Sequence, residues 1–401
     1  MQLLELLHNQ FERSVSYTHK RRLNSLFDAV GTLLKSNELS LTALGRNIQS
    51  KAKPRSNIKK IDRLLGNTKL HDEIASFYQV MNNKLLSPNS NPWIHIDWSC
   101  ICATTEMYVL RATLTMKSRS IVVYEQGYPK KQENNHATHK AFLDKLKKML
   151  PEGMKPIIVT DAGYRTPWFS YIQELGWYFV GRLRSQIAIK FDDAEEWQLS
   201  QDLYEKATGK PTGLGVGLLT KKKQLPAELV LFKGKKKKRR YKSKASGKGP
   251  SKTRYKKANN EPLLLATNLG GANVALKAIN VYRQRMRIEE SFRDTKASAY
   301  GFGLGNSRTR CHKRMSVLLL IAAIATYACW VASICIETMN KVSDYQAQSS
   351  KNKGVLSPVF LGRIVLRKQL VITSALFECA QQVLNQINIL AQSEEPEYEQ
   401  I

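Results

Sequence analysis

The sequence predicts an α/β fold in which a mixed sheet is preceded and followed by helical regions. Two observations carry this prediction: apolar residues have helical spacing before Pro92, and they change to a strand-like period of two directly after it. A third observation is an uncharged stretch from Met315 to Ile336, which predicts a long buried helix. A chain of 401 residues is long enough for two or three structural units.

The chain is strongly basic, and its charge predicts a polyanionic partner. It contains 63 Lys and Arg against 33 Asp and Glu, which gives a formal net charge of +30. This excess goes far beyond what solubility requires and favours nucleic acid over a membrane surface. Charge alone indicates no chemistry, so a binder without enzymatic activity is still an alternative at this point.

Residues 1–90 are predicted to form a helical DNA-binding domain. Apolar residues between Leu23 and Leu34 recur at helical spacing, and Ser40 can cap a helix that begins at Leu41. The amphipathic helix that follows has a cationic side, which could also be an ordinary solvated surface. The candidate DNA contacts of this region are Arg46, Lys51, Lys53, Arg55, Lys59, Lys60 and Arg63.

The stretch from Trp93 to Leu183 predicts strands and helices in the order β-β-β-α-β-α-β. The first three strands are close enough in sequence to form an antiparallel meander. This order of elements is that of a ribonuclease-H-like core. Strands are expected at 93–98, 107–114, 120–125, 156–161 and 177–183, and helices at 142–150 and 169–175.

Residues 185–275 interrupt this order and contain further predicted strands. Strands are expected at Glu228–Phe232 and Leu263–Thr267. Between them lies a basic loop, 233–257, in which 14 of 25 residues are Lys or Arg, a charge density that nucleic acid would neutralise. Its candidate DNA contacts are Lys236, Lys237, Arg239 and Arg240.

Two aspartates occupy positions at which open sheets place their functional sites. Asp97 lies in the first predicted strand, and Asp161 lies at the carboxyl end of the fourth. Two-metal phosphoryl transfer needs cations about 4 Å apart that are held by acidic oxygens. The two aspartates therefore favour a metal-dependent site, although most acidic residues only solvate a surface.

A third carboxylate is expected from a helix that starts near Lys277. Tyr282, Arg285, Glu289 and Lys296 are spaced Y-x2-R-x3-E-x6-K and share an arc of about 60°, if one helix continues to the last of them. An apolar strip beside this arc can seat the helix on the sheet. The other two acidic residues of the helix point elsewhere, so the spacing selects Glu289.

The predicted catalytic core consists of 91–184 and 276–336, and 337–401 are expected to be a helical C-terminal region and a candidate for dimerisation. The uncharged stretch at its end is long enough to cross a bilayer. Its many alanines and its Ser and Thr suit a helix buried against a sheet equally well, so no membrane partner is expected. Further phosphate contacts are assigned to Arg293, Arg308 and Arg310.

Other cofactor chemistries find no support in the sequence. The six cysteines show no zinc-site spacing, and no Gly-rich loop with GK[ST] is present, so no nucleotide cofactor is expected. His95, His136 and His139 are expected to be structural or to contact DNA rather than to bind metal, because hard-metal phosphoryl chemistry favours carboxylates. No secretion signal opens the chain, which indicates a cytoplasmic protein.

The Y-R-E-K motif resembles that of bacterial insertion-sequence transposases of family four, which are cut-and-paste enzymes of the DDE type. Further blocks similar to that family lie at 61–67, 96–99, 159–163 and 286–294. The resemblance therefore extends over most of the chain.

This resemblance implies roles for the motif residues. It implies that Asp97, Asp161 and Glu289 are the catalytic residues and hold two Mg²⁺ ions per site, with Mn²⁺ able to replace them. It also implies that Tyr282, Arg285 and Lys296 hold the terminal DNA phosphate.

The resemblance further implies that 185–275 are the family's strand-rich insertion domain. It also implies double-stranded DNA, both element ends and target, as the substrate, a DNA-bridged homodimer and a hairpin intermediate. The sequence departs from the family at one position. Related enzymes often have a tryptophan that stacks on a flipped base, and this sequence has Leu263 in the corresponding region. Leucine has no π-face for stacking, so either another aromatic residue such as Trp197 or Tyr255 replaces the tryptophan, or the flipped base is held less firmly.

We therefore expect a DNA transposase that cuts an insertion sequence at its ends and joins the freed 3′-hydroxyls to target DNA, in a bacterial cytoplasm and associated with the nucleoid. One alternative is a catalytically silent descendant that binds DNA ends and acts as a repressor. Another is a ribonuclease H or junction resolvase, which the basic N-terminus, the insertion and the motif helix disfavour.

Overall fold

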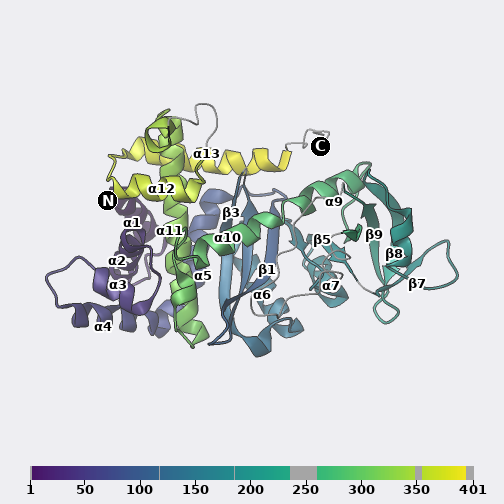
Figure 1. The fold of residues 1–401 in the computed structure, drawn as a ribbon, viewed down its shortest axis with the longest axis horizontal. Helices are drawn as coiled ribbons and strands as arrows, with labels where there is room; N and C mark the ends of the chain where they lie inside the picture. The colour runs from purple at the N-terminus through teal and green to yellow at the C-terminus, as the bar shows by residue number, and fades with distance from the viewer. Residues whose placement is uncertain (1, 117, 185, 235–259, 348–354, 394–401) are drawn as a thin grey trace. The chain divides into compact units, whose positions relative to one another are not determined.

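The computed structural model describes residues 2–116, 118–184, 186–234, 260–347 and 355–393 (Figure 1). The chain forms two compact units. Unit 1 combines Met1–Pro156 with Met286–Glu394, and unit 2 contains Ile157–Arg285. The domain boundaries expected from the sequence, near 184 and 276, divide the chain differently and stay a prediction.

Unit 1 begins with the expected helical region. The predicted cap at Ser40 is present, because its hydroxyl accepts a hydrogen bond from the backbone N–H of Ala43 at 3.3 Å. The helices are α1 (Gln2–Ser14), α2 (Lys20–Ser36), α3 (Leu41–Asn47), α4 (Pro54–Leu65) and α5 (Thr68–Leu85).

Three antiparallel strands form the sheet of unit 1, as the alternating pattern predicted. They lie in the order β3-β2-β1, with β1 at Trp93–Cys102, β2 at Met107–Thr115 and β3 at Ser120–Pro129. The 3₁₀ turn η1 (Lys130–Gln132) leads to helix α6 (His136–Met149). The order of strands and helices predicted from Trp93 onward is confirmed.

The C-terminal part of unit 1 is helical and packs against the N-terminal helices. Figure 1 shows α10 lying across the strands and α11 running between the strands and the N-terminal helices. Arg367 donates hydrogen bonds to the carbonyls of Leu34 and Lys35, which ties α12 to the end of α2. The elements are α10 (Met286–Lys296), η3 (Leu304–Asn306), α11 (His312–Thr338), η4 (Val342–Tyr345), α12 (Pro358–Arg367) and α13 (Ser374–Ser393).

Helix α11 is the uncharged stretch singled out in the sequence. It is the one described helix long and apolar enough to cross a membrane, and 94% of its most apolar window is buried inside the protein. It packs against β3, α2, α5, α12 and α13. The prediction of a buried core helix is confirmed, because neighbouring elements cover the helix on all sides.

Unit 2 is rich in strands. Strands β4 and β5 are parallel, the other pairs are antiparallel, and the order is β4-β5-β10-β9-β8-β6-β7. The elements are β4 (Ile157–Thr160), α7 (Thr166–Glu174), β5 (Tyr178–Leu183), β6 (Ala188–Phe191), β7 (Gln198–Leu199), η2 (Asp202–Lys206), β8 (Thr212–Leu219), β9 (Leu225–Phe232), β10 (Leu263–Thr267) and α9 (Val274–Arg283).

Strand β8 was not predicted, because glycine occupies three of its eight positions. Glycine is depleted in strands and supplies no side chain for packing. The register of β8 against β9 shifts between Gly213 and Gly215, and Gly215 adopts a φ of +90°. The irregular backbone at Gly215 therefore favours glycine, and the glycines remove the alternating pattern from which a strand is predicted.

The prediction of a single helix that starts near Lys277 and continues to Lys296 is wrong. The chain leaves the α-helix at Gln284 and Arg285, where both backbone N–H groups bond three residues back, and a new helix begins at Met286. The physical reason is that each half packs on different strands, α9 on β9 and β5 of unit 2 and α10 on β1 and β3 of unit 1. Of the four motif residues expected to share one arc, only Glu289 and Lys296 lie on the same helix, α10.

Gly362 sets the distance between α12 and α11, and this leads to a stability prediction. A Cβ atom at this position would lie 1.8 Å from the backbone oxygen of Cys329. Gly362→Ala should therefore lower the free energy of unfolding by about 1–3 kcal/mol or more, measured by urea denaturation. Gly209→Ala is the control, because an added Cβ there meets nothing within 4 Å. Equal urea midpoints for the two variants would contradict the proposed close packing.

Candidate active site

Asp97 lies half-buried in β1 on a face of the sheet that carries charge. It is directly opposite Arg111 of β2, which is directly opposite Glu125 of β3. Directly opposite residues of antiparallel strands present their side chains on the same face, so these three share one face. The backbone N–H of Trp98 donates to Asp97 Oδ1 at 2.9 Å and orients the carboxylate.

Helix α10 covers this face. Lys296 Nζ donates to Ser99 Oγ at 2.9 Å and to the Cys100 carbonyl at 3.3 Å. Ser99 is two residues after Asp97 and therefore points to the same face of β1. Glu289 precedes Lys296 by seven residues, which places the two about 20° apart around the helix. Unit 1 thus brings Asp97 and the Glu289–Lys296 side of α10 to one face of the sheet.

The amine of Lys296 is electrostatically perturbed. Burial lowers its pKa below the ordinary value, and repulsion by the Arg111 guanidinium lowers it further, whereas Cys100 and Asp97 act in the opposite direction. The ammonium therefore lies within electrostatic reach of Asp97.

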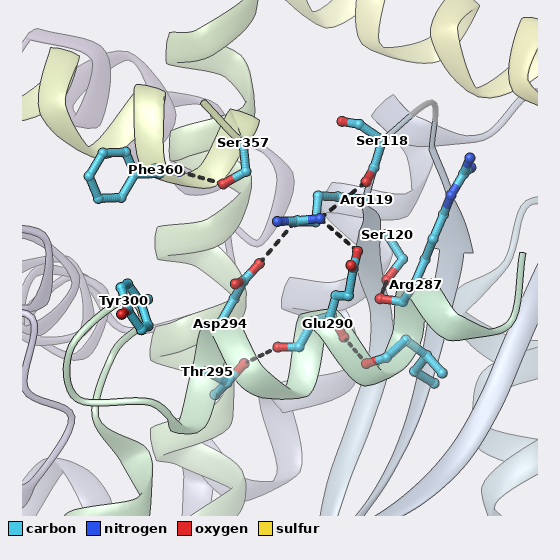
Figure 2. A network of polar contacts seen from close by, with 12 residues as sticks. Ser118, Arg119, Ser120, Arg287, Glu290, Asp294, Thr295, Tyr300, Ser357 and Phe360 are labelled. Carbon is cyan, nitrogen blue, oxygen red and sulfur yellow. Dashed lines mark hydrogen bonds and ion pairs between the residues drawn. The ribbon is translucent and has the colours of Figure 1, made fainter. Parts of the chain in front are cut away.

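The opposite side of α10 is fixed by Arg119, as Figure 2 shows. Arg119 forms ion pairs with Glu290 at 2.6 Å and with Asp294 at 3.6 Å. At the start of the helix, Ser120 Oγ donates to the Arg287 carbonyl at 3.0 Å. The expectation that Glu290 and Asp294 point away from the Glu289 face agrees with these contacts.

Asp161 belongs to unit 2, where it follows the last residue of β4. Its Oδ1 accepts a hydrogen bond from the backbone N–H of Gly163 at 2.8 Å, which closes a tight turn. A Cβ atom on Gly163 would lie 3.0 Å from that oxygen. The turn therefore holds the carboxylate at the carboxyl end of the strand and favours glycine two residues later.

Charged side chains lie near Tyr282 in unit 2. Burial raises the pKa of Tyr282, while Arg285 and a hydrogen bond from Arg182 oppose the rise, and Asp161 adds to it. Thr160 pairs with Gly181, so Asp161 and Arg182 are the next residues along two neighbouring parallel strands. Unit 2 therefore places Tyr282 within electrostatic reach of Asp161 and of a second motif residue, Arg285.

Arg182 is a residue that the sequence analysis missed. Glu261 holds it, with an Arg182 Nη2 to Glu261 Oε2 distance of 3.7 Å, and also accepts from Arg184 at 2.6 Å and from the Tyr204 hydroxyl at 3.0 Å. Arg182 Nε is buried and has no hydrogen-bond acceptor in the described part of the chain. A charged residue inside the apolar strand Tyr178–Leu183 was the signal available in the sequence.

The other predicted DNA contacts lie mostly at the surface of unit 1. Lys60 is half-buried and pairs with Asp28 at 2.5 Å. Exposed positions are found for Arg293, Arg308, Arg310, Arg46, Lys51, Lys53, Arg55, Lys59 and Arg63. Four basic residues and the candidate stacking residue lie outside the described residues: Lys236, Lys237, Arg239, Arg240 and Tyr255.

No group of three His, Cys, Asp or Glu side chains that could hold a metal ion occurs within the residues that the structure describes. Asp97 and Glu289 belong to unit 1, and Asp161 belongs to unit 2. All three supply carboxylate oxygens, the donors that Mg²⁺ prefers. The chemistry of the donors therefore fits the ion expected from the sequence.

The comparison with protein families identifies the class of protein. The model of the transposase DDE domain matches residues 102–327, more than half of the chain. The chain therefore belongs to the DDE transposase family, and the prediction of a DDE transposase is confirmed at this level. The match contains Asp161 and Glu289 and begins just after Asp97. Among curated proteins, no match to the chain is found.

The histidines near β1 have structural contacts. Trp98 Nε1 donates to His139 Nε2 at 2.8 Å, so this nitrogen must be unprotonated. Burial lowers the pKa of His139 to about 4, and the neighbouring His136 adds to the shift. His95 is fully buried, with its Nδ1 2.8 Å from Thr115 Oγ1.

His139 should make the stability of the protein depend on pH. Its folded-state pKa of about 4 lies below the ordinary 6.5, so below pH 6.5 the unfolded chain binds a proton that the folded chain excludes. Stability is then complete above pH 6.5 and is lost as pH falls towards 4, by up to about 2 kcal/mol at pH 5.

His139→Gln keeps an acceptor for Trp98 but does not titrate. The difference between its urea midpoints at pH 7.5 and pH 5 should be smaller than that of the wild type. Parallel changes in both proteins would show that another group titrates.

Proposed function

We propose that this protein is an insertion-sequence transposase that cuts double-stranded DNA at element ends and joins the freed 3′-hydroxyls to target DNA. The observation that carries the proposal is the placement of Asp97 on the sheet face covered by α10, the helix with Glu289 and Lys296. The family match supports it independently. The finer assignment is to family four, on the Y-R-E-K motif and a ribonuclease-H-like core.

The catalytic residues of the proposal are Asp97, Asp161 and Glu289. Two Mg²⁺ ions held by these carboxylates would activate the attacking oxygen and stabilise the leaving one, and Mn²⁺ can replace them. In first-strand cleavage a water oxygen forms a bond to phosphorus, and the bond from phosphorus to the 3′ oxygen breaks. The water loses a proton and the 3′ oxygen gains one, which leaves a 3′-hydroxyl and a 5′-phosphate.

In the next step the freed 3′-hydroxyl is the nucleophile. It attacks a phosphodiester of the opposite strand, which gives a hairpin, and a second water reopens this hairpin. The same hydroxyl then attacks the target strand, so each joining reaction exchanges one phosphodiester bond for another. No nucleotide cofactor is required, because no net bond energy is consumed.

Tyr282, Arg285 and Lys296 are proposed to bind the terminal phosphate, and Arg182 supports this group. A guanidinium only donates hydrogen bonds, so the Tyr282 oxygen accepts from Arg182 and its own proton is directed elsewhere. A phosphate oxygen is a suitable acceptor for that proton. Arg182 thereby orients the tyrosine hydroxyl towards an anion.

The remaining assignments follow from the same proposal. Residues 1–90 recognise element ends, 185–275 form the insertion domain, and a homodimer bridged by DNA acts in the bacterial cytoplasm at the nucleoid. Residues 337–401 are the candidate dimerisation region. Because Leu263 at the start of β10 cannot stack on a base, Trp197 is the candidate for base stacking among the residues that the structure describes.

Removing one catalytic carboxylate should abolish cleavage. Asp97→Asn, Asp161→Asn and Glu289→Gln should each lower cleavage of the protein's own flanking DNA in Mg²⁺ by about 10³-fold or more, since each removes charge that binds a metal ion. End binding, measured by gel shift, should change little. Asp192→Asn and Glu196→Gln make the same chemical changes at exposed positions and serve as controls.

A triad variant that still cuts at the wild-type rate would remove that residue from the site. Wild-type protein that binds ends but never cuts them would favour the silent repressor.

Loss of a phosphate-binding residue should affect the later steps most. Arg285→Ala, Lys296→Ala and Arg182→Ala should spare first-strand nicking more than hairpin formation and joining, as read from denaturing gels that separate these products. Arg285→Lys should rescue only in part, because lysine lacks the bidentate guanidinium. Lys222→Ala, at an exposed turn, is the control. Equal losses at all steps would mean that these residues serve general binding or the fold.

A further inference from the structure

A fully buried ion pair lies beneath α10. Arg111 has no exposed surface, and the exposure of Glu125 is 1%. Arg111 Nε and Nη2 both lie 2.7 Å from Glu125 Oε2. The pair joins β2 to β3 on the face that carries Asp97.

The same guanidinium is bound to the backbone of α10 through two hydroxyl groups. Arg111 Nη1 donates to Ser291 Oγ at 3.1 Å, and Nη2 donates to Thr295 Oγ1 at 3.0 Å. These hydroxyls in turn donate to the carbonyls of Ile288 and Ser291 at 2.9 and 3.0 Å. The ring of Phe292 lies 4.3 Å from the guanidinium carbon. One buried cation therefore contacts three positions on one side of the helix.

Stability alone gives no reason for this arrangement. Removing two charges from water has a large desolvation cost, and apolar residues of similar volume often stabilise a protein as well or better. Glu125 Oε1 is buried and has no hydrogen-bond partner among the described residues, which adds to that cost. Burial raises the pKa of Glu125, and Arg111 opposes the rise.

A planar guanidinium with directed donors fixes more than the distance between helix and sheet. Its bonds to Ser291 and Thr295 set both the rotation of α10 and its position along its axis, which an apolar contact does not. On the same helix, Glu289 lies about 160° from Ser291 and about 120° from Thr295. A rotation of the helix would therefore move Glu289 relative to Asp97.

We propose that Arg111 is a positioning residue of the transposition reaction: held by Glu125, it fixes the rotation and axial position of α10 and so places Glu289 on the Asp97 side of the helix. This inference rests on the proposed function. A displacement of about 1 Å in a catalytic group is enough to lower a rate by about 10²-fold.

The decisive variant replaces both charges by apolar residues of similar volume. Arg111→Met combined with Glu125→Met should fold with a urea midpoint equal to or above that of the wild type. It should bind element ends with unchanged affinity, yet its single-turnover cleavage should fall by about 10²-fold. A stable variant that cleaves at the wild-type rate would overturn the proposal.

A second measurement is independent of activity. Hydrogen exchange of the backbone amides of 286–296, followed by mass spectrometry, should be faster in the double variant, while α13 should exchange as in the wild type. Unchanged exchange in α10 would overturn the proposal. If the wild type cuts no DNA, the proposed function fails, and the exchange experiment still decides whether Arg111 holds the helix.

Two conservative variants keep the test decisive should the double variant fail to fold. Thr295→Ser retains the hydroxyl and should keep most of the cleavage, whereas Thr295→Val has the same shape without the acceptor and should lose about tenfold. Equal cleavage by both variants at equal stability would remove the hydroxyl contact from the mechanism.

Discussion

The architecture of unit 1 depends on a charge that has no access to water. Arg111 lies in the central strand of a three-stranded sheet and is fully buried, so its donors must be satisfied by protein atoms. Glu125 satisfies some of them from the neighbouring strand, and the hydroxyls of α10 satisfy the others. The hydrogen-bond requirement of Arg111 therefore fixes one side of the helix that carries Glu289, and the ion pairs of Arg119 fix the other.

The Y-R-E-K motif is shared between two structural units. Tyr282 and Arg285 belong to unit 2, together with Asp161 and Arg182, whereas Glu289 and Lys296 belong to unit 1 with Asp97. Each unit thus contains at least one proposed metal ligand and at least one proposed phosphate contact. The boundary between the units coincides with the helix break at Gln284 and Arg285, so the motif residues are divided between two sets of functional groups and do not form one helical face.

Elements with a strong local signal could be predicted from the sequence, and features set by long-range contacts could not. The meander after Pro92 follows from its period of two, and β10 was expected with its observed bounds. Strand β8 could not be predicted, because its glycines give no strand pattern. The helix break could not be predicted either, because it arises from packing on different strands and no Gly or Pro marks it. Asp97 and Glu289 were selected by pattern. The importance of Arg111 and Arg182 depends on strand register, which no local pattern contains.

The discontinuity of unit 1 has a consequence for synthesis of the chain. Its first strands and helices emerge from the ribosome before residues 157–285, and their partners α10, α11, α12 and α13 emerge afterwards. At about 5–20 residues per second, the delay is on the order of ten seconds. During that interval the apolar surface that will receive α11 is uncovered, and it becomes a protein interior only when α11 has emerged. A nascent chain therefore has no completed Asp97 face until α10 has emerged.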